Sequence, residues 1–287
     1  PLDTDFYSYT PKSSGTGDLI LYTYDSSGNE IGSKTGTITV RCDKDKCKPV
    51  ITATIVDINE TTKALTGNNA KLIKGYSNAQ IAYTIDVLNS ATLKSKTVNG
   101  SALGTSPHTI SKVSTGTFNI LAIDSRDFDT TEIKTNELVE YIPLTLDFNA
   151  YRPTPTGSEI KVNFQGNYFD DSFGTVDNTL ELSWKYRIKG ATAWTDGGTF
   201  VKDTDYTISN NKFTSIDDIN LSETLFDYQN NYEIAIFYAD KLVNTSTTKT
   251  VPKGKPVLNW EDGLVNVNGK LCINDTQVLE YEIVNTW

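Results

Sequence analysis

The chain has 287 residues and a formal net charge of −10 at pH 7, and so acidic a surface repels phosphate backbones and argues against nucleic acid as a partner. No apolar run approaches the ~20 residues needed to cross a bilayer, and the first residues carry no signal-peptide pattern. One histidine, three cysteines and no methionine leave few ligands for a metal. Because the chain starts at Pro1, we expect it to be a piece of a longer protein.

Thr, Asn, Asp, Ser, Tyr, Val and Ile dominate the composition, which favours strands and turns. Three segments repeat one plan: an alternating apolar strand, a polar turn, and a Thr/Ser-rich strand that ends near a proline. These strand pairs are 19–24 with 33–40, 118–123 with 130–141, and 232–238 with 243–251. They begin roughly 100 residues apart, which is too long for a solenoid unit but suits whole sandwich domains. The sequence therefore predicts an all-β fold of tandem immunoglobulin-like or fibronectin type III-like β-sandwiches in an extended array.

The predicted domains follow from these pairs in chain order. Residues 1–48 are the C-terminal part of an immunoglobulin-like domain, since too few residues precede Leu19 to supply its other strands. Residues 49–142 are an immunoglobulin-like domain with strands over 51–58, 79–87 and 94–98 and a turn at Asn99-Gly100. Residues 143–251 are a fibronectin type III-like domain. Residues 252–287 are a junction and a β-hairpin that opens a distal module, with Asn268-Gly269 between 264–267 and 270–273.

The domain over 143–251 has the clearest pattern. Leu180, Leu182, Trp184 and Tyr186 alternate along one strand and should share a buried face. A buried Trp on the third strand and a Tyr that opens the penultimate strand, here Tyr232, are hallmarks of sandwiches. A strand ending in Tyr-Arg, a glycine turn, a Trp and a later tyrosine corner resemble fibronectin type III domains; here they are 184–187, Gly190, Trp194 and Tyr232. This resemblance covers about 110 residues and implies a fold but no activity.

Cysteine and histidine offer little chemistry. Cys42 and Cys47 could form a small disulfide or remain two free thiols, and Cys272 stands alone. His108 lacks a second histidine for a zinc site or a catalytic triad, so we interpret it as a loop residue.

Acidic residues give two further hypotheses. Asp124, Asp127 and Asp129 could donate oxygens to calcium, although the spacing is not that of an EF-hand, and a solvated hairpin end with Asx hydrogen bonds is favoured. The pairs Asp170-Asp171 and Asp217-Asp218 could serve glycoside hydrolysis, but both lie in predicted loops without an aromatic cleft.

Four aromatic residues in predicted loops, Tyr168, Phe169, Phe173 and Trp194, could lie exposed and stack on sugars or on a partner. Packing in a core or between domains is the favoured interpretation of each. We therefore expect no catalytic, cofactor-binding or metal-ligating residues, no cofactor and no enzyme activity.

Two stretches resemble phage proteins. Residues 116–127, GTFNILAIDSRD, resemble the T-x-x-V-x-A-x-D-S-R strand and turn of an uncharacterised family of structural proteins from siphophages of Gram-positive bacteria, and residues 149–152 also fit. Residues 254–260 with 265–269 are similar to the G-x-P-x-x-x-W … V-N-G junction of phage tail-tip and fibre proteins. The charged linker that carries Cys42 and Cys47 departs from the pattern.

This resemblance implies a structural virion protein of a phage tail tip, baseplate or fibre that acts as a stalk and in host attachment. It also implies a homotrimer associated near Trp260, with other tail or baseplate proteins and host cell-wall polysaccharide as partners. The alternative is a bacterial cell-surface adhesin or wall protein with immunoglobulin-like repeats. A third interpretation makes these domains accessories of a carbohydrate-active enzyme whose catalytic residues lie outside this chain.

Overall fold

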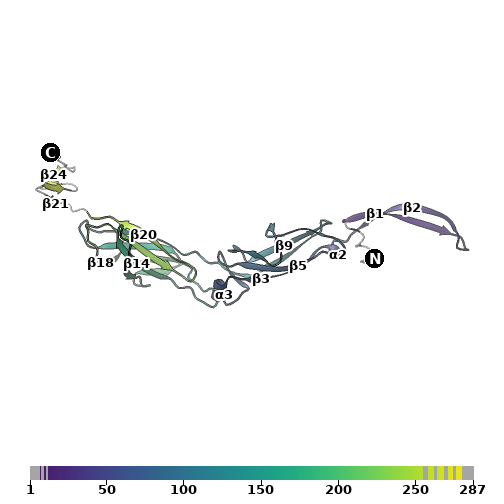
Figure 1. Cartoon of the computed structure of the whole chain (residues 1–287), viewed down its shortest axis with the longest axis horizontal. Coiled ribbons are helices and arrows are strands. Elements are labelled where there is room, and N and C mark those ends of the chain that lie inside the picture. Colours follow the sequence, from purple (N-terminus) through teal and green to yellow (C-terminus); the bar gives the residue numbers. More distant parts are fainter. Residues whose placement is uncertain are drawn as a thin grey trace. The chain divides into compact units, whose positions relative to one another are not determined.

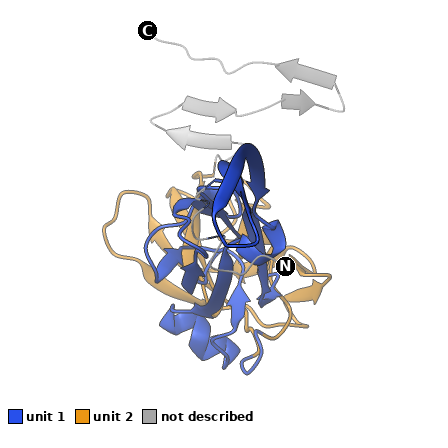
Figure 2. Ribbon diagram, turned by 90° about the vertical axis from the view of Figure 1, so that its right-hand side faces the viewer, with its two compact units in different colours: residues 1–141, 173–176 blue, residues 142–172, 177–287 orange. Residues whose placement is uncertain are grey.

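The computed structural model describes residues 7, 10 and 12–254 and four further strands over 258–261, 264–267, 271–273 and 276–279. Strands make up most of the described chain (Figure 1). The chain divides into two compact units: unit 1 is Pro1–Tyr141 with Phe173–Val176, and unit 2 is Ile142–Ser172 with Asp177–Trp287 (Figure 2). Each unit has its own hydrophobic core. None of the helices in the described residues has the length and hydropathy to span a membrane.

Unit 1 contains a sandwich of two antiparallel sheets. One sheet has the order β3-β5-β8, namely β3 (Val50–Asp57), β5 (Ala79–Asp86) and β8 (His108–Ile110). The other has the order β10-β9-β6-β7, namely β6 (Leu93–Val98), β7 (Ser101–Ala102), β9 (Thr117–Asp124) and β10 (Asp129–Thr135). Alternate residues such as Ile55, Ile81 and Ile120 fill the space between the sheets, as expected for strands with one buried face. The predicted turn is present, because Asn99 and Gly100 both have positive φ between β6 and β7.

One predicted strand of unit 1 is wrong in extent. The segment 130–141 is not a single strand, because β10 ends at Thr135 and β11 (Glu137–Val139) pairs in parallel with β4 (Lys71–Ile73). Asn136 makes the change of partner possible. Its side-chain amide donates to the carbonyl oxygens of Ile55 at 3.2 Å and Ala70 at 2.8 Å. A short helix, α3 (Glu60–Thr66), precedes β4 and is capped by Asn59 and by the left-handed Gly67.

The amino-terminal part of unit 1 is a long two-stranded ribbon, made of β1 (Ser14–Tyr24) and β2 (Glu30–Arg41). The predicted hairpin is confirmed by its antiparallel register, and Asp25 closes its turn by accepting from the backbone N–H groups of Ser27 and Asn29 at 2.8 Å. In the described residues the two strands pair with each other and with no further strand, so the ribbon is exposed on both faces. A four-residue helix, α2 (Lys44–Cys47), connects it to β3.

Unit 2 repeats the sandwich plan. Its first sheet has the order β12-β13-β17-β16, with β18 also paired to β13, and its second sheet has the order β15-β14-β19-β20. The first comprises β12 (Thr145–Tyr151), β13 (Ile160–Asn167), β16 (Tyr206–Ser209), β17 (Lys212–Ser215) and β18 (Ile219–Ser222). The second comprises β14 (Glu181–Ile188), β15 (Thr195–Thr199), β19 (Tyr232–Ala239) and β20 (Asn244–Val251).

The predicted inner face of β14 is confirmed, since Leu182 and Trp184 are buried in the core of unit 2 and Leu180 and Tyr186 pack against it. The closing hairpins agree between the units. The pair β9–β10 joins β6 through β9, and the pair β19–β20 joins β14 through β19. The prediction of an all-β fold with tandem immunoglobulin-like sandwiches is therefore confirmed.

Beyond residue 254 four strands are described. β21 (Leu258–Glu261) pairs with β22 (Leu264–Val267), and β23 (Leu271–Ile273) pairs with β24 (Thr276–Leu279). The predicted pairing of 264–267 with 270–273 is not among those made by the described strands, and the Asn268-Gly269 turn itself lies outside the described residues.

Candidate functional site

The aspartates proposed for calcium do not converge. Asp124 is fully buried, and its Oδ1 accepts from the backbone N–H groups of Arg126 at 2.8 Å and Phe128 at 2.9 Å, which is the predicted Asx arrangement. Asp127 pairs with Lys94, and Asp129 pairs with Lys44 at 2.6 Å, a contact that holds the pKa of the Asp129 carboxyl below its usual value. Within the described residues no three His, Cys, Asp or Glu side chains gather as a metal site would require.

The same turn holds Arg126, whose side-chain contacts were not predicted from the sequence. Arg126 is buried, and its guanidinium donates to four main-chain oxygens, which we call the Arg126 clamp. Nε binds the carbonyl of Thr10 at 3.0 Å and Nη1 that of Leu88 at 2.9 Å, while Nη2 binds the carbonyls of Tyr7 at 3.2 Å and Asn89. The prediction of a solvated turn is therefore wrong for Arg126 at its centre, which is buried. A buried guanidinium needs acceptors for its N–H groups, and here the backbone carbonyls supply them.

The buried charge of Arg126 has one acidic neighbour. Oδ2 of Asp124 lies 3.8 Å from Nη1 of Arg126, and among the residues that the structure describes it has no hydrogen-bond partner. Both side chains are fully buried. The carboxylate and the guanidinium therefore neutralise each other at the point where residues 7 and 10, ahead of the ribbon, meet the loop after β5.

The two thiols lie at the same base of the ribbon. Cys42 is half-buried, with its Sγ 3.6 Å from the carbonyl oxygens of Thr10 and Lys12, and burial raises its pKa. Cys47 is buried and accepts from the side-chain amide of Asn89 at 3.5 Å. Both are free thiols in this structure, so the predicted alternative of two free thiols holds here and the disulfide does not.

Unit 2 has a matching arrangement around Arg152, which we call the Arg152 clamp. Nη1 donates to the carbonyls of Gly157 at 2.9 Å and Phe226 at 3.1 Å, and Nη2 to those of Asp227 at 3.0 Å and Asn230 at 3.3 Å. Nε donates to Pro252 at 3.3 Å, where the chain leaves β20. Burial lowers the pKa of Arg152. The clamp therefore fixes the last residues of the sandwich to its own loops.

Tyr232 opens the penultimate strand of the sandwich, as predicted, and it also supports this clamp. Its ring packs 5.6 Å from the guanidinium of Arg152, and its hydroxyl accepts from the backbone N–H of Asp227 at 3.2 Å. The tyrosine corner therefore joins the loop before β19 to the core.

Two further candidate residues, His108 and Asp218, contact neighbouring parts of their own sandwich. His108 is not in a loop but begins β8, where it lines a hollow of about 230 Å³ with Val98, Val113 and Phe118 among others. Asp218 accepts from the Tyr151 hydroxyl at 2.6 Å and from the Asn163 amide at 2.7 Å, and these bonds lower its pKa.

The four aromatic residues divide into two groups. Tyr168, Phe169 and Phe173 are buried, which confirms packing and contradicts an exposed role in stacking. Phe173 stacks on Tyr141 inside unit 1, with ring centroids 5.9 Å apart. Trp194 is half-buried and lies 4.3 Å from the guanidinium of Arg187. None of the four forms an exposed aromatic platform.

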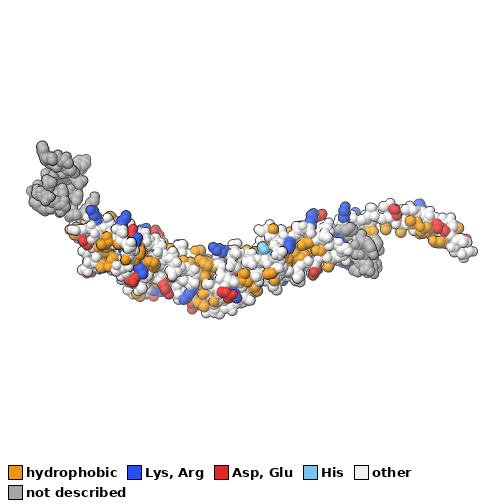
Figure 3. Space-filling view, in the orientation of Figure 1, with side chains coloured by type: hydrophobic (Ala, Val, Ile, Leu, Met, Phe, Trp, Pro, Cys, Tyr) orange, Lys and Arg blue, Asp and Glu red, His pale blue; other side chains and the backbone are white. Residues whose placement is uncertain are grey.

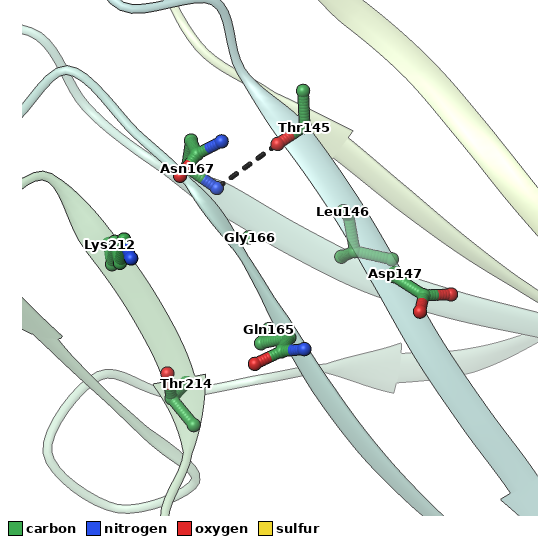
Figure 4. Close-up of a pocket in the computed structure, with 8 residues that line it drawn as sticks. All are labelled: Thr145, Leu146, Asp147, Gln165, Gly166, Asn167, Lys212 and Thr214. Atoms are coloured by element: carbon green, nitrogen blue, oxygen red, sulfur yellow. Dashed lines mark hydrogen bonds between the residues drawn. The ribbon is translucent and has the colours of Figure 1, made fainter.

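A polar hollow lies on the outer side of the first sheet of unit 2 (Figure 4). It measures about 360 Å³ and is lined by Thr145, Leu146, Asp147, Gln165, Gly166, Asn167, Lys212 and Thr214. The backbone N–H of Asn167 donates to the Thr145 hydroxyl at 3.2 Å across it. Lys249 binds Asp147 at 3.1 Å and holds the pKa of that carboxyl below its usual value. Hydroxyl, amide, carboxylate and ammonium groups thus face one shallow surface, a set that can hydrogen-bond to sugar hydroxyls.

No known family model matches the chain, and no curated protein sequence does so either. Similar solved structures include the three N-terminal domains of the bacteriophage RB49 highly immunogenic outer capsid protein, with 12% identity over 85% of this chain and 90% of that one and a TM-score of 0.29. Fibronectin(III)-like modules of Clostridium thermocellum CbhA match with 10% identity, 70% and 94% coverage and a TM-score of 0.23. Cadherin domains 1–4 of protocadherin gamma B7 match with 11% identity, 83% and 66% coverage and a TM-score of 0.30. Similarity at this level carries no argument about what the chain does.

Proposed function

We propose that this chain is a structural segment of a phage tail tip, baseplate or fibre, where it acts as a stalk that holds other parts of the virion at a fixed distance. The proposal starts from the resemblance of residues 116–127 to structural proteins of siphophages, and of residues 254–260 with 265–269 to a junction of phage tail-tip and fibre proteins. The structure gives the motif a physical role that suits a stalk. The arginine of the motif in residues 116–127 is Arg126. Its side chain donates to the carbonyl oxygens of Thr10 and Tyr7, which precede the ribbon.

The observation that carries the proposal is the pair of arginine clamps. Arg126 binds main-chain oxygens of residues ahead of the ribbon and of a loop of the first sandwich, and Arg152 binds main-chain oxygens where the chain leaves the second. Hydrogen bonds from a charged donor are about twice as strong as neutral ones. A stalk is loaded through its chain ends, so bonds at these two places resist peeling of the terminal segments from the sandwiches.

Host attachment is the second part of the proposal, and the polar hollow of unit 2 favours it. Its hydroxyl, amide and charged groups suit a host cell-wall polysaccharide. One shallow site binds such a polymer weakly, and repetition of the chain in a virion would multiply weak contacts through effective concentration. The homotrimer and the contacts with other tail or baseplate proteins stay predictions of the same proposal.

Immunogold labelling of purified particles with an antibody raised against residues 49–251 tests the location. The proposal expects gold at the distal end of phage tails. Gold on the bacterial wall, with none on virions, would instead support the alternative of a cell-surface adhesin.

Attachment needs a separate measurement, because a stalk need not bind the host. We expect the chain to sediment with purified host cell walls, and Lys212→Ala to reduce the bound fraction. Lys189→Ala removes an exposed lysine outside the hollow and is the matched control. Equal binding by both variants would remove the hollow from the proposal and leave the stalk.

A further inference from the structure

The two faces of the β1–β2 ribbon differ in their glycines, because all four strand glycines lie on one face. Between the base of the ribbon and the bulge at Thr23, the odd-numbered residues 15–23 of β1 and the even-numbered residues 32–40 of β2 share one side, which we call the glycine face. It carries Leu19, Leu21 and Ile38, whose exposed fractions are 56%, 68% and 38%, and its sole charge is Lys34. The opposite side carries the exposed Ile20 and Tyr22 as well as Asp18 and Arg41, and it has no glycine. Figure 3 shows hydrophobic side chains gathered along the ribbon.

Glycines and large side chains alternate across the glycine face in a regular way. Near the base, Gly15 lies opposite Val40 and Gly17 opposite Ile38, so the small residue is on β1. Toward the tip the order reverses, because Leu19 lies opposite Gly36. Thr23 and Gly32 repeat the reversed order beyond the Leu21–Lys34 pair.

The glycines leave open space in this chain. A Cβ atom added at Gly17, Gly32 or Gly36 would meet no atom within 4 Å, so neither packing nor positive φ requires glycine at these positions. Glycine weakens a strand interior and often marks a place where another backbone or a ligand approaches closely. A two-stranded ribbon that stands alone is only marginally stable in water. Both facts indicate that something covers this face.

We propose that the glycine face packs against the same face of a second copy of this chain. A twofold axis parallel to the strands places β1 of one copy over β2 of the other at the same level. The tips of the two ribbons then lie at the same end. Ile38 of each copy then lies over Gly17 of the other copy, and Leu19 over Gly36. Every glycine of the face receives a larger side chain, which is the self-complementarity that a twofold interface requires.

The alternative arrangements fit less well. A twofold axis across the strands at the level of Leu19 would set Leu19 against Leu19 and Gly36 against Gly36. Moved midway between the levels of Gly17 and Leu19, it would set Leu19 over Gly17, but it would also set Val40 over Lys34 and leave Gly32 without a larger side chain of this face. Three copies around a threefold axis cannot lay three flat faces on one another in pairs, so this contact is distinct from the one that a homotrimer associated near Trp260 would use. A carbohydrate or an unrelated protein would not need the glycines to change strands halfway along the ribbon.

The size of the face sets the expected strength. Five residue pairs on two strands cover roughly 300 Å² on each copy, from the rise per residue and the strand spacing. A standard stable interface buries ~800 Å² on each partner. We therefore expect a weak dimer, with a dissociation constant between roughly 1 μM and 1 mM.

Analytical ultracentrifugation of the full chain across this concentration range tests the proposal. We expect reversible dimers, and we expect Gly17→Val or Gly36→Val to raise the dissociation constant about tenfold or more. Thr37→Val places the same side chain on the opposite face of β2 and should leave the dissociation constant unchanged. Because the added side chains meet open space within one copy, the variants should keep the circular dichroism of the unaltered protein.

A chain that stays monomeric to about 1 mM overturns the proposal, as does a trimer or a dimer that Gly17→Val leaves intact. The direction of the two ribbons is tested by spin labels at Ser26→Cys in a chain whose Cys42, Cys47 and Cys272 are serine. Copies that run in the same direction bring the two tips within roughly 20 Å, whereas opposed copies separate them by roughly 50 Å. The larger distance contradicts the proposed pairing. The proposal is independent of the phage assignment, since it concerns this chain alone.

Discussion

The β1–β2 ribbon and the β19–β20 hairpin come from the same sequence pattern but have opposite surroundings. In β19, Ile234 and Ile236 are fully buried between the sheets of unit 2. In β1, Leu19 and Leu21 alternate in the same way, yet more than half of each side chain is exposed. The two hairpins share an antiparallel register and a Thr-rich second strand. They differ in whether a second sheet lies against them.

This difference shows which structural information an alternating sequence pattern carries and which it does not. Alternation fixes which residues share a face, because successive side chains point to opposite sides of a strand. It does not determine what covers that face. For β19 the cover is the sheet β12-β13-β17-β16 of the same unit. For β1 the described residues supply none, and the proposed cover is a second copy.

The largest expected effect concerns the arginine at the base of each hairpin. Arg126→Met should destabilise unit 1 by about 3–5 kcal/mol, because it leaves the Asp124 carboxylate buried without a counter-ion. Arg152→Met should cost unit 2 only about 1–3 kcal/mol, since its acceptors are main-chain oxygens, most of them in exposed loops. Urea denaturation of each variant measures both. A cost for Arg126→Met no larger than that for Arg152→Met would contradict the role given to Asp124.

Shortening one apolar side chain in each hairpin compares directly how much each hairpin depends on burial. Ile236→Ala should cost about 2–5 kcal/mol of unfolding free energy, because it removes fully buried methyl groups from the core of unit 2. Leu21→Ala should change it by no more than about 0.5 kcal/mol in dilute protein, because that side chain is mostly exposed. Chemical denaturation followed by tryptophan fluorescence and circular dichroism gives both values. Equal losses would mean that the ribbon is covered within one chain.

Glycine-to-alanine changes sharpen the same contrast. At Gly166 of β13 an added Cβ would collide with the carbonyl oxygen of Thr145 and with the Phe213 ring, so Gly166→Ala should destabilise unit 2 by about 1–3 kcal/mol. At Gly17 of β1 the same methyl meets open space, so Gly17→Ala should be neutral or slightly stabilising in dilute protein. Thermal unfolding of the two variants at low concentration provides the comparison. A clear loss of stability in Gly17→Ala would show that the ribbon has an intramolecular neighbour.

The smallest expected effect is the contribution of one carboxyl group of unit 2, that of Asp218, to the pH dependence of stability. Hydrogen bonds from Asn163 and Tyr151 lower the pKa of Asp218 in the folded chain. The stability that this contact contributes is therefore present above the ordinary aspartate pKa and is lost as the pH falls through the lowered value. Asp218→Asn should flatten the acid limb of the stability curve for unit 2 and leave unit 1 unchanged. An identical acid limb in both proteins would rule the contact out as a contributor.

Much of the fold could be predicted from local patterns, and the exceptions have a common cause. The three strand pairs and the inner face of Leu182 and Trp184 follow from alternation within a few residues. The switch from β10 to β11 could not be predicted, because it depends on hydrogen bonds from Asn136 to Ile55 and Ala70, far away in sequence.

The clamps were missed for a related reason. Arg126 lies in a run of polar residues that is typical of a solvated turn, and its acceptors are carbonyl groups that any residue provides. The acceptors of such a site are set by the backbone geometry, which leaves no trace in side-chain type. Asp57 is a second case, since its partner Ser77 is 20 residues away and binds it at 2.6 Å in the interior of unit 1.

Hydrogen exchange measured by mass spectrometry tests the central distinction most directly, because it reports the protection of each strand in the intact chain. In dilute protein we expect strong protection of β9, β14 and β19 and fast exchange throughout β1 and β2. Raising the concentration into the range of the proposed dimer should slow exchange in the ribbon alone. Protection of β1 and β2 that equals that of β19 in dilute protein, and does not change with concentration, would contradict an uncovered ribbon and the proposal built on it.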